Sequence, residues 1–395
     1  MEILRNLWRR KLRNVLTISG IAIGILAYST MGAMAEKNNK LIDGGIQYYS
    51  DHVTVGASNA SPFGGGLITL EKVEEVRKVE GVAAAFPSAV ALAKADSGIS
   101  FGPPATLVSN QAGVEEYSTF KLSVSSGRLD NIKDGEVVLG ADLAKELIAK
   151  VGDTVHLPLP PKEPREDFIN HPFTVVGILD KTLTAPDTMA LITLREAQRA
   201  LGDALPPAIR SQVDTTKLIS GIDVYGNPRV DLDELAKKIN AEVQGLKATP
   251  PSELVDLFKQ VSLIFSAITL GAALLALIVG GLAVVNTMLM SVTERYREIG
   301  LKRALGARTH HILQEFLAES AVIGLVGGSI GLAFGWAITT AINGATAKDN
   351  LELFLFSPAL AIGALLFATG LGVIAGVAPA LQAARLDPVT ALRSQ

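Results

Sequence analysis

Four long apolar segments constrain this chain more than any other feature. A helix needs roughly 20 residues to cross a hydrocarbon core about 30 Å thick, and residues 15–35, 261–290, 312–342 and 358–381 each contain such a run. Only 19% of the residues are charged, against roughly 25% in ordinary soluble domains. The sequence therefore predicts a membrane protein with four transmembrane α-helices.

The segment between the first two apolar runs, residues 36–260, has an ordinary globular composition. The run EVVLG at 136–140 reads as a buried strand, and FTVVGILD at 173–180 is rich in β-branched residues. Thr193 can cap a helix, with Glu196 three residues later. We expect a large extracytoplasmic α+β domain with two lobes, which gives one helix before the domain and three after it.

Within this domain, ADLAKELIAK (141–150) shows the apolar spacing of an amphipathic helix. Leu143, Leu147 and Ile148 fall on one face at a period of 3.6 residues. We expect one helix over residues 141–150 with these three side chains on its apolar face.

Basic flanks set the expected orientation, because Lys and Arg in short flanks mark the cytoplasmic side. The N-terminal segment 1–14, the loop 291–311 and the tail 382–395 are basic, whereas the short loop 343–357 has a single lysine. Four crossings place the three basic flanks on one side. We expect a multi-pass protein of the bacterial or archaeal cell (inner) membrane, with both termini cytoplasmic and the large domain outside.

The first apolar segment has an alternative interpretation as a cleaved signal peptide. Its flank is basic, and MGAMA at 31–35 ends in small residues as a cleavage site does. The length of the apolar run favours a retained transmembrane helix.

The domain at 36–260 contains 31 acidic and 23 basic residues, a net charge of −8. A nucleic-acid-binding surface requires clustered positive charge, and the domain shows none. The sequence therefore argues against nucleic acid as a partner.

No catalytic or metal-binding motif is visible. The chain has no cysteine and lacks the phosphate-loop, zinc-protease and serine-hydrolase signatures. His52, His156 and His171 are scattered, and the adjacent His310 and His311 point about 100° apart on a helix. We expect no enzyme activity and no cofactor in this chain.

The charged stretch SVTERYREIGLKRALGARTHHILQEFLAES (291–320) lies between two apolar segments. Glu298 and Lys302 have the favourable i, i+4 order, and Gly306 breaks the helix. The apolar contacts come from Ile299, Leu301 and Leu305. We predict a short cytoplasmic helix, followed by an amphipathic lead-in to the third transmembrane helix. It is either an anchor on lipid head groups or a docking element for a cytoplasmic protein.

The segment SVTERYREIGLKRALGAR resembles the cytoplasmic loop signature of MacB/FtsX-type ABC transporter permeases. GRLDNIKDGEVVLGADLAKELIAKVGDTVHL, followed by FTVVGILD, resembles the periplasmic core domain of that family, and ARLDPVTALR its C-terminal ending. The likeness covers essentially the whole chain. MacB itself carries an ATPase domain before its first membrane helix, so this sequence is more similar to stand-alone permeases, including the lipoprotein-release and DevC-type permeases.

The resemblance implies that the charged helix is a coupling helix docked on a cytoplasmic ABC ATPase subunit. The implied docking residues are Glu294, Arg295, Arg297, Glu298, Gly300, Lys302, Arg303, Gly306, Ala307 and Arg308. ATP and Mg would bind to that ATPase. A second permease copy would complete a homodimer or a related heterodimer in the bilayer, and a membrane-fusion adaptor stays an open alternative.

Glycines in the apolar segments suit close approach of helix backbones. The expected helix-packing positions are Gly280, Gly281, Gly324, Gly328, Gly331 and Gly335. Glycine is also an ordinary component of membrane helices, so composition alone is the competing explanation.

The function that the resemblance implies is mechanotransmission: ATP hydrolysis moves the outer domain, and this movement drives export or extraction of a substrate. The alternative is an FtsX-like transmembrane signal transmitter that controls an extracellular hydrolase. A membrane sensor without any ATPase is a third reading, but it leaves the charged loop unexplained.

Overall fold

The computed structural model describes residues 11–59, 66–94, 104–161, 168–346, 352–387 and 391. The chain divides into two compact units: Met1–Asn38, Leu263–Ala345 and Glu352–Gln395 form the first, and Asn39–Ser262 with Thr346–Leu351 form the second. Parts of the predicted segments 1–14, 343–357 and 382–395 lie outside the described residues.

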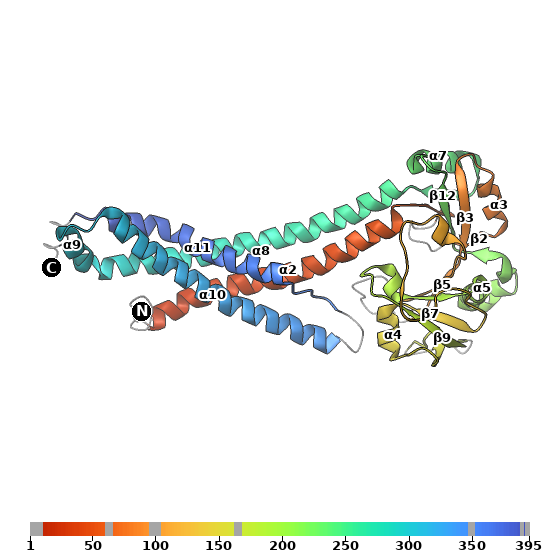
Figure 1. The fold of residues 1–395 in the computed structure, drawn as a ribbon, viewed down its shortest axis with the longest axis horizontal. Coiled ribbons are helices and arrows are strands. Elements are labelled where there is room, and N and C mark those ends of the chain that lie inside the picture. The colour runs from red at the N-terminus through yellow and green to blue at the C-terminus, as the bar shows by residue number, and fades with distance from the viewer. Residues whose placement is uncertain are drawn as a thin grey trace. The chain divides into compact units, whose positions relative to one another are not determined.

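The first unit is built from long helices (Figure 1). They are α2 (Lys11–Tyr49), α8 (Pro251–Glu294), α10 (Thr309–Thr346) and α11 (Pro358–Ala384). Each is long and apolar enough to cross a membrane. The prediction of four such helices, one before the domain and three after it, is confirmed.

Two of these helices extend well beyond the apolar segments seen in the sequence. α2 continues past residue 35 to Tyr49, and α8 begins at Pro251, before residue 261. Hydropathy predicts which part of a helix lies in lipid, but it does not predict where the helix ends, because backbone hydrogen bonds can continue a helix into polar sequence. Both helices therefore run continuously from one unit into the other.

Helix contacts in the first unit combine apolar and hydroxyl pairs. Ile21 and Ile25 of α2 are buried in a cluster that includes Met288 of α8. The hydroxyls of Thr17 and Thr287 hydrogen-bond to each other. Such inter-helix hydroxyl pairs satisfy polar groups that lipid cannot solvate.

The second unit contains two β-sheets, each with its own buried core. The first lobe has the antiparallel order β13-β1-β12-β3; its strands are β13 (Leu246–Thr249), β1 (Val53–Ala57), β12 (Gly221–Gly226) and β3 (Val82–Ser88). Helices α3 (Glu71–Arg77) and α7 (Leu232–Glu242) pack on this sheet through Val73, Val76, Leu235 and Ile239.

The second lobe has the mixed order β4-β5-β10-β7-β9-β6, with β8 paired to β9. Its strands are β4 (Val90–Leu92), β5 (Thr106–Ser109), β10 (Met189–Ile192), β7 (Glu136–Leu139), β9 (His171–Leu179), β6 (Val124–Gly127) and β8 (Thr154–Leu157). Helices α4 (Ala141–Leu147) and α5 (Leu194–Ala204) share its core. The prediction of an α+β domain with two lobes is confirmed.

Short elements complete the second unit. They are β2 (Ile68–Thr69), β11 (Leu218–Ile219), α6 (Pro207–Arg210), η1 (Val114–Glu116), η2 (Ala185–Thr188) and η3 (Thr215–Lys217). β2 and β11 pair antiparallel.

Several local predictions hold. β7 and β9 occupy the two predicted strand segments, and the Thr193 hydroxyl accepts a hydrogen bond from the Glu196 amide at the start of α5. One prediction is wrong: α4 ends at Leu147, and Ile148 is 85% exposed with φ of 54°. The left-handed backbone at the helix end turns this side chain away from the core.

Candidate functional site

A separate short helix, α9 (Tyr296–Ala304), lies between α8 and α10 (Figure 1). Glu298 lies in its first turn and Lys302 and Arg303 in its last turn, which suits the helix dipole. Gly306 has φ of 93°, and the Ala307 amide donates to the Lys302 carbonyl. The prediction that Gly306 ends the helix is confirmed, because glycine adopts this left-handed conformation without strain.

Arg295 ties α9 to the start of α10. Its guanidinium lies 3.3 Å from Glu298, 3.0 Å from Glu315 and 3.3 Å from Glu319. The Arg295 side chain is only 17% exposed, and its charge also lies 5.5 Å from the ring centroid of Phe316. A cation that contacts several carboxylates and an aromatic ring holds these neighbours in a defined arrangement.

Lys302 extends this network. Its ammonium lies 3.0 Å from Glu315 and 3.4 Å from Glu298. Burial opposes the charge of Arg295, but hydrogen bonding to Glu298 and the nearby carboxylates outweigh it and raise the pKa of Arg295. The hydrogen bond from Arg295 lowers the pKa of Glu298. Both shifts favour the charged forms of Arg295 and Glu298, so this ion pair is stabilised within the hairpin.

A different face of the α9 segment is exposed. Leu301 is 51% exposed and Leu305 is 81% exposed, and Arg297 and Arg308 are exposed beside them. We call these four residues the α9 face. Of the three apolar residues predicted to supply contacts, Ile299 is buried in the apolar cluster of the first unit, whereas Leu301 and Leu305 are exposed.

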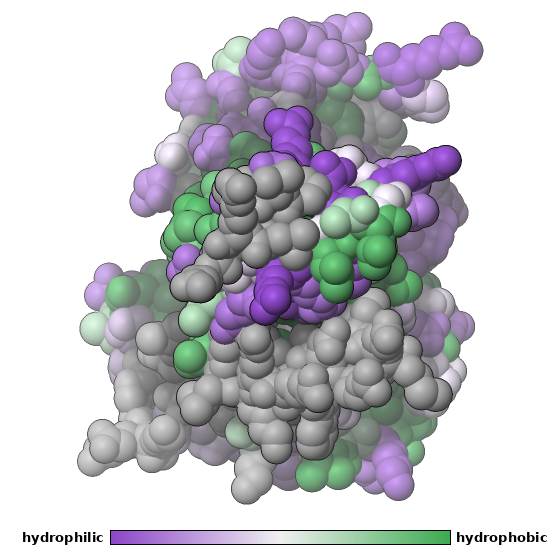
Figure 2. Space-filling view, turned by 90° about the vertical axis from the view of Figure 1, so that its left-hand side faces the viewer, coloured by the Kyte–Doolittle hydropathy of each residue, from purple (hydrophilic) through white to green (hydrophobic). Residues whose placement is uncertain are grey.

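Figure 2 shows the molecular surface on the side where Figure 1 labels α9. Hydrophobic side chains lie among hydrophilic ones on this surface. A loop that had only to connect two helices would have no need of exposed leucines, whereas interaction sites commonly combine apolar and charged groups.

Two of the expected docking residues have packing roles. A Cβ on Gly300 would lie 2.5 Å from the Cβ of Ala391, so α9 packs closely against the C-terminal segment there. Ala307 packs against the apolar cluster of the first unit. The Arg303 guanidinium donates to the Thr309 hydroxyl at 2.8 Å, across the turn that contains Gly306. Glu294 and Arg308 are exposed.

Glycines of α10 face two neighbouring helices. Towards α11, a Cβ on Gly324 would lie 2.5 Å from the Ala368 carbonyl oxygen, and one on Gly328 would lie 2.5 Å from the Ala368 Cβ. Towards α2, Gly331 faces Ala22 and Gly335 faces Ser29. The structure thus places α10 in backbone contact with both α2 and α11.

The other glycines of the membrane helices differ in how closely their neighbours approach. A Cβ on Gly280 would lie 3.0 Å from Leu371, and one on Gly281 would lie 3.6 Å from it. Gly327, which faces Ile21, and Gly372 and Gly376, which face Ser320, are also closely packed. They lie in the glycine-rich stretches 324–335 and 370–376, where the sequence favours close helix approach. The four-residue spacing of Gly327, Gly331 and Gly335 was a readable signal for one helix face.

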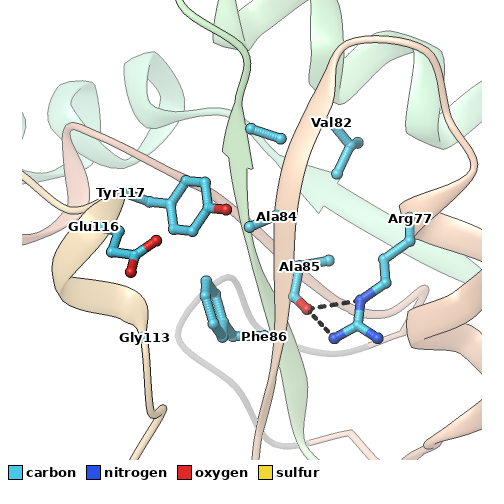
Figure 3. A pocket seen from close by; sticks show the side chains of 9 residues that line it. Arg77, Val82, Ala84, Ala85, Phe86, Gly113, Glu116 and Tyr117 are labelled. Atoms are coloured by element: carbon cyan, nitrogen blue, oxygen red, sulfur yellow. Dashed lines mark hydrogen bonds between the residues drawn. The ribbon is translucent and has the colours of Figure 1, made fainter.

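The second unit has an open groove of about 400 Å³ beside β3, which is an edge strand of the sheet in the first lobe. Figure 3 shows Glu116 and Tyr117 on one side of β3 and Arg77 on the other. Arg77 donates two hydrogen bonds to the Ala85 carbonyl, at 3.2 and 2.8 Å. The groove is shallow and its polar groups do not converge on one point, so it lacks the geometry of a catalytic centre.

The MacB-like periplasmic core domain model matches residues 15–242, more than half of the chain, and the FtsX-like permease C-terminal model matches residues 270–388. The chain therefore belongs to the family of FtsX-like permeases with a MacB-like periplasmic core domain. The predicted resemblance and fold class are confirmed.

Full-length similarity to curated proteins agrees with this assignment. The pyoverdine export ATP-binding/permease protein PvdT of Pseudomonas fluorescens is 27% identical over 99% of this chain and 58% of its own length. The macrolide export ATP-binding/permease proteins MacB of Hyphomonas neptunium and Marinobacter nauticus are 29% and 30% identical, over 99% of this chain and 60% of their own lengths. The chain thus spans about three fifths of these relatives.

A solved structure of the MacB periplasmic region from Actinobacillus actinomycetemcomitans matches 54% of this chain and 94% of its own, with 14% identity and a TM-score of 0.34. A score of this size is too low to bear on the fold.

Proposed function

We propose that this chain is the membrane subunit of an ABC exporter in which a separate cytoplasmic ATPase, with ATP and Mg bound, drives movements of the extracytoplasmic domain. The α9 face carries this proposal. It lies in the basic loop assigned to the cytoplasm, and it presents side chains that neither the hairpin nor the core of the first unit uses.

The ATPase contact is made by the α9 face rather than by the whole charged segment. Leu301 and Leu305 fill an apolar cleft, and Arg297 and Arg308 meet an acidic rim on the partner. Glu298 lies within 4 Å of Arg295 and Lys302, so we assign it to holding the hairpin together. The docking surface is therefore apolar and positive.

We assign transmission to the outer domain to α2 and α8, whose continuity supports this part of the proposal. Both helices run from the first unit into the second without a break. A displacement at α9, which directly follows α8, is carried along α8 as a semi-rigid rod. A second permease copy and lipid cover the many exposed apolar side chains of the membrane helices.

The match to the MacB-like core domain over residues 15–242 favours an exporter over a transmitter that controls a hydrolase. Relatives are named for export of macrolides and of pyoverdine, which differ in chemistry. We therefore propose export or extraction as the activity and assign no substrate.

The test is purification of the tagged permease from its own membranes, with measurement of Mg-dependent ATP turnover in the eluate. Leu305→Glu places a charge in the proposed cleft and should lower the turnover that copurifies about tenfold, which corresponds to about 1.4 kcal/mol. Ile148→Glu is the control, because Ile148 is equally exposed but lies in the second unit. Normal turnover with Leu305→Glu would contradict the docking proposal and favour the alternative that α9 is a lipid anchor.

A further inference from the structure

A buried histidine lies where α2 meets the first lobe. α2 ends at Tyr49, and Asp51 and His52 follow before β1 begins at Val53. His52 is 5% exposed. Its Nδ1 lies 2.9 Å from Asp51 Oδ1, and its Nε2 lies 3.9 Å from Asp223 Oδ1. The imidazole therefore connects the end of α2 to β12 in the middle of the first lobe.

The two carboxylates are also bonded to the second lobe. Asp51 accepts hydrogen bonds from the Ser118 hydroxyl at 2.9 Å and the Thr119 amide at 2.6 Å. Asp223 accepts one from the Gln111 amide side chain at 2.6 Å. These three donors lie in the connection between β5 and β6. A single cluster therefore joins the end of α2 to both lobes.

Aromatic rings enclose the cluster and extend it to α8. The His52 ring centroid lies 5.4 Å from Tyr225, 6.1 Å from Tyr48 and 6.0 Å from Tyr49. Tyr49 lies 6.1 Å from Phe258 near the start of α8. The part of α8 within the second unit is therefore packed against the same cluster.

Electrostatics strengthen the cluster while His52 is protonated. Burial opposes the charge, but the hydrogen bond to Asp51 and the charges of Asp223 and Asp51 outweigh it and raise the pKa of His52. Burial alone would raise the pKa of Asp51. The hydrogen bonds from His52 and from the Thr119 amide outweigh burial and lower the pKa of Asp51 to about 2. Burial raises the pKa values of Tyr48, Tyr49 and Tyr225, so these phenols stay neutral.

The stability of the His52 cluster depends on pH. A raised histidine pKa stabilises the folded cluster fully below the ordinary value of about 6.5, and that contribution is lost as the pH rises through the folded pKa. The contribution of Asp51 is present above its ordinary value of about 3.9 and is lost as the pH falls through about 2. The cluster is therefore strongest at mildly acidic pH.

We propose that His52, with Asp51 and Asp223, is a positioning residue that clamps the ends of α2 and α8 to both lobes of the outer domain, and that this clamp loosens when His52 loses its proton. Its consequence, that force in the membrane helices reaches the outer domain through this point, rests on the proposed function. The clamp itself exists in the permease alone.

The clamp can be measured by electron spin resonance on full-length permease in nanodiscs. The chain has no native cysteine, so spin labels go on Gln47→Cys in α2 and Glu115→Cys in η1, both exposed. We expect a narrow distance distribution at about pH 6 that broadens reversibly at about pH 8.5. His52→Gln cannot be protonated and should give the broad distribution at both pH values.

His171→Gln is the matched control. His171 is also buried and paired with an aspartate, its Nε2 lying 2.7 Å from Asp203, but it belongs to β9 of the second lobe. This variant should keep the pH response of the parent. The proposal is overturned if the parent shows no pH response, if His52→Gln retains it, or if His171→Gln abolishes it.

A second measurement separates this inference from the proposed function. In the complex with the ATPase, His52→Gln should leave copurification unchanged and weaken only the nucleotide-dependent response of the outer domain. Because the spin-label measurement needs no ATPase, failure of the docking proposal would leave its result intact.

Discussion

Arg295 and Arg297 lie two residues apart, yet their surroundings differ completely. Arg295 contacts three carboxylates and the ring of Phe316, whereas Arg297 is exposed on the α9 face. The same side chain thus stabilises the hairpin at one position and is free to meet a partner at the other.

This contrast gives a prediction with an internal control. Arg295→Ala removes the guanidinium that joins α9 to Glu315 and Glu319 of α10, so amide exchange in α9 should accelerate about tenfold or more. Arg297→Ala should leave that exchange unchanged but reduce copurification of the ATPase. Hydrogen exchange followed by mass spectrometry measures the first effect, and equal exchange in both variants would contradict it.

Glycines in the membrane helices give a second residue-scale prediction. Alanine at Gly324 would place its Cβ against the Ala368 carbonyl, whereas Gly370 has nothing within 4 Å of that position. Overpacking costs about 1–3 kcal/mol, while alanine in an open helical position stabilises by about 0.5–1 kcal/mol. The thermal midpoint in detergent should fall for Gly324→Ala and stay level or rise for Gly370→Ala. Equal midpoints would mean that this contact is loose.

At the scale of elements, sequence reasoning succeeded where the signal is local. The strands at Glu136–Leu139 and His171–Leu179 and the Thr193 cap depend on neighbouring residues, and all three are present. Ile148 fitted the helical period, but its own left-handed backbone ends the helix at Leu147. Periodicity reports a face and does not report where the backbone leaves the helix.

Contacts between distant elements could not be predicted. Glu298 and Lys302 were recognised as a local pair, but the partners of Arg295 on α10 depend on how the hairpin closes. His52 was set aside because no second histidine is near it in sequence. Its partner Asp223 lies on a strand that only the assembled sheet brings close.

At the scale of the whole molecule, the orientation in the membrane gives a direct prediction. Ser126 in the second unit and Thr309 at the start of α10 are both exposed. A membrane-impermeant thiol reagent on intact cells should label Ser126→Cys and spare Thr309→Cys, because basic flanks hold the second site in the cytoplasm. Permeabilised cells should show labelling at both sites. The reverse pattern in intact cells would overturn the topology.

The central claim is that nucleotide events at the ATPase reach the outer domain through this chain. The most direct measurement is hydrogen exchange of residues 39–59 and 251–262 in the ATPase complex, with and without Mg-ATP. We predict that Mg-ATP changes exchange in both segments, and that Leu305→Glu removes the change while leaving exchange without nucleotide as in the parent. The account is contradicted if Mg-ATP does not change hydrogen exchange in these segments of the parent complex. It is also contradicted if Mg-ATP changes exchange equally in Leu305→Glu.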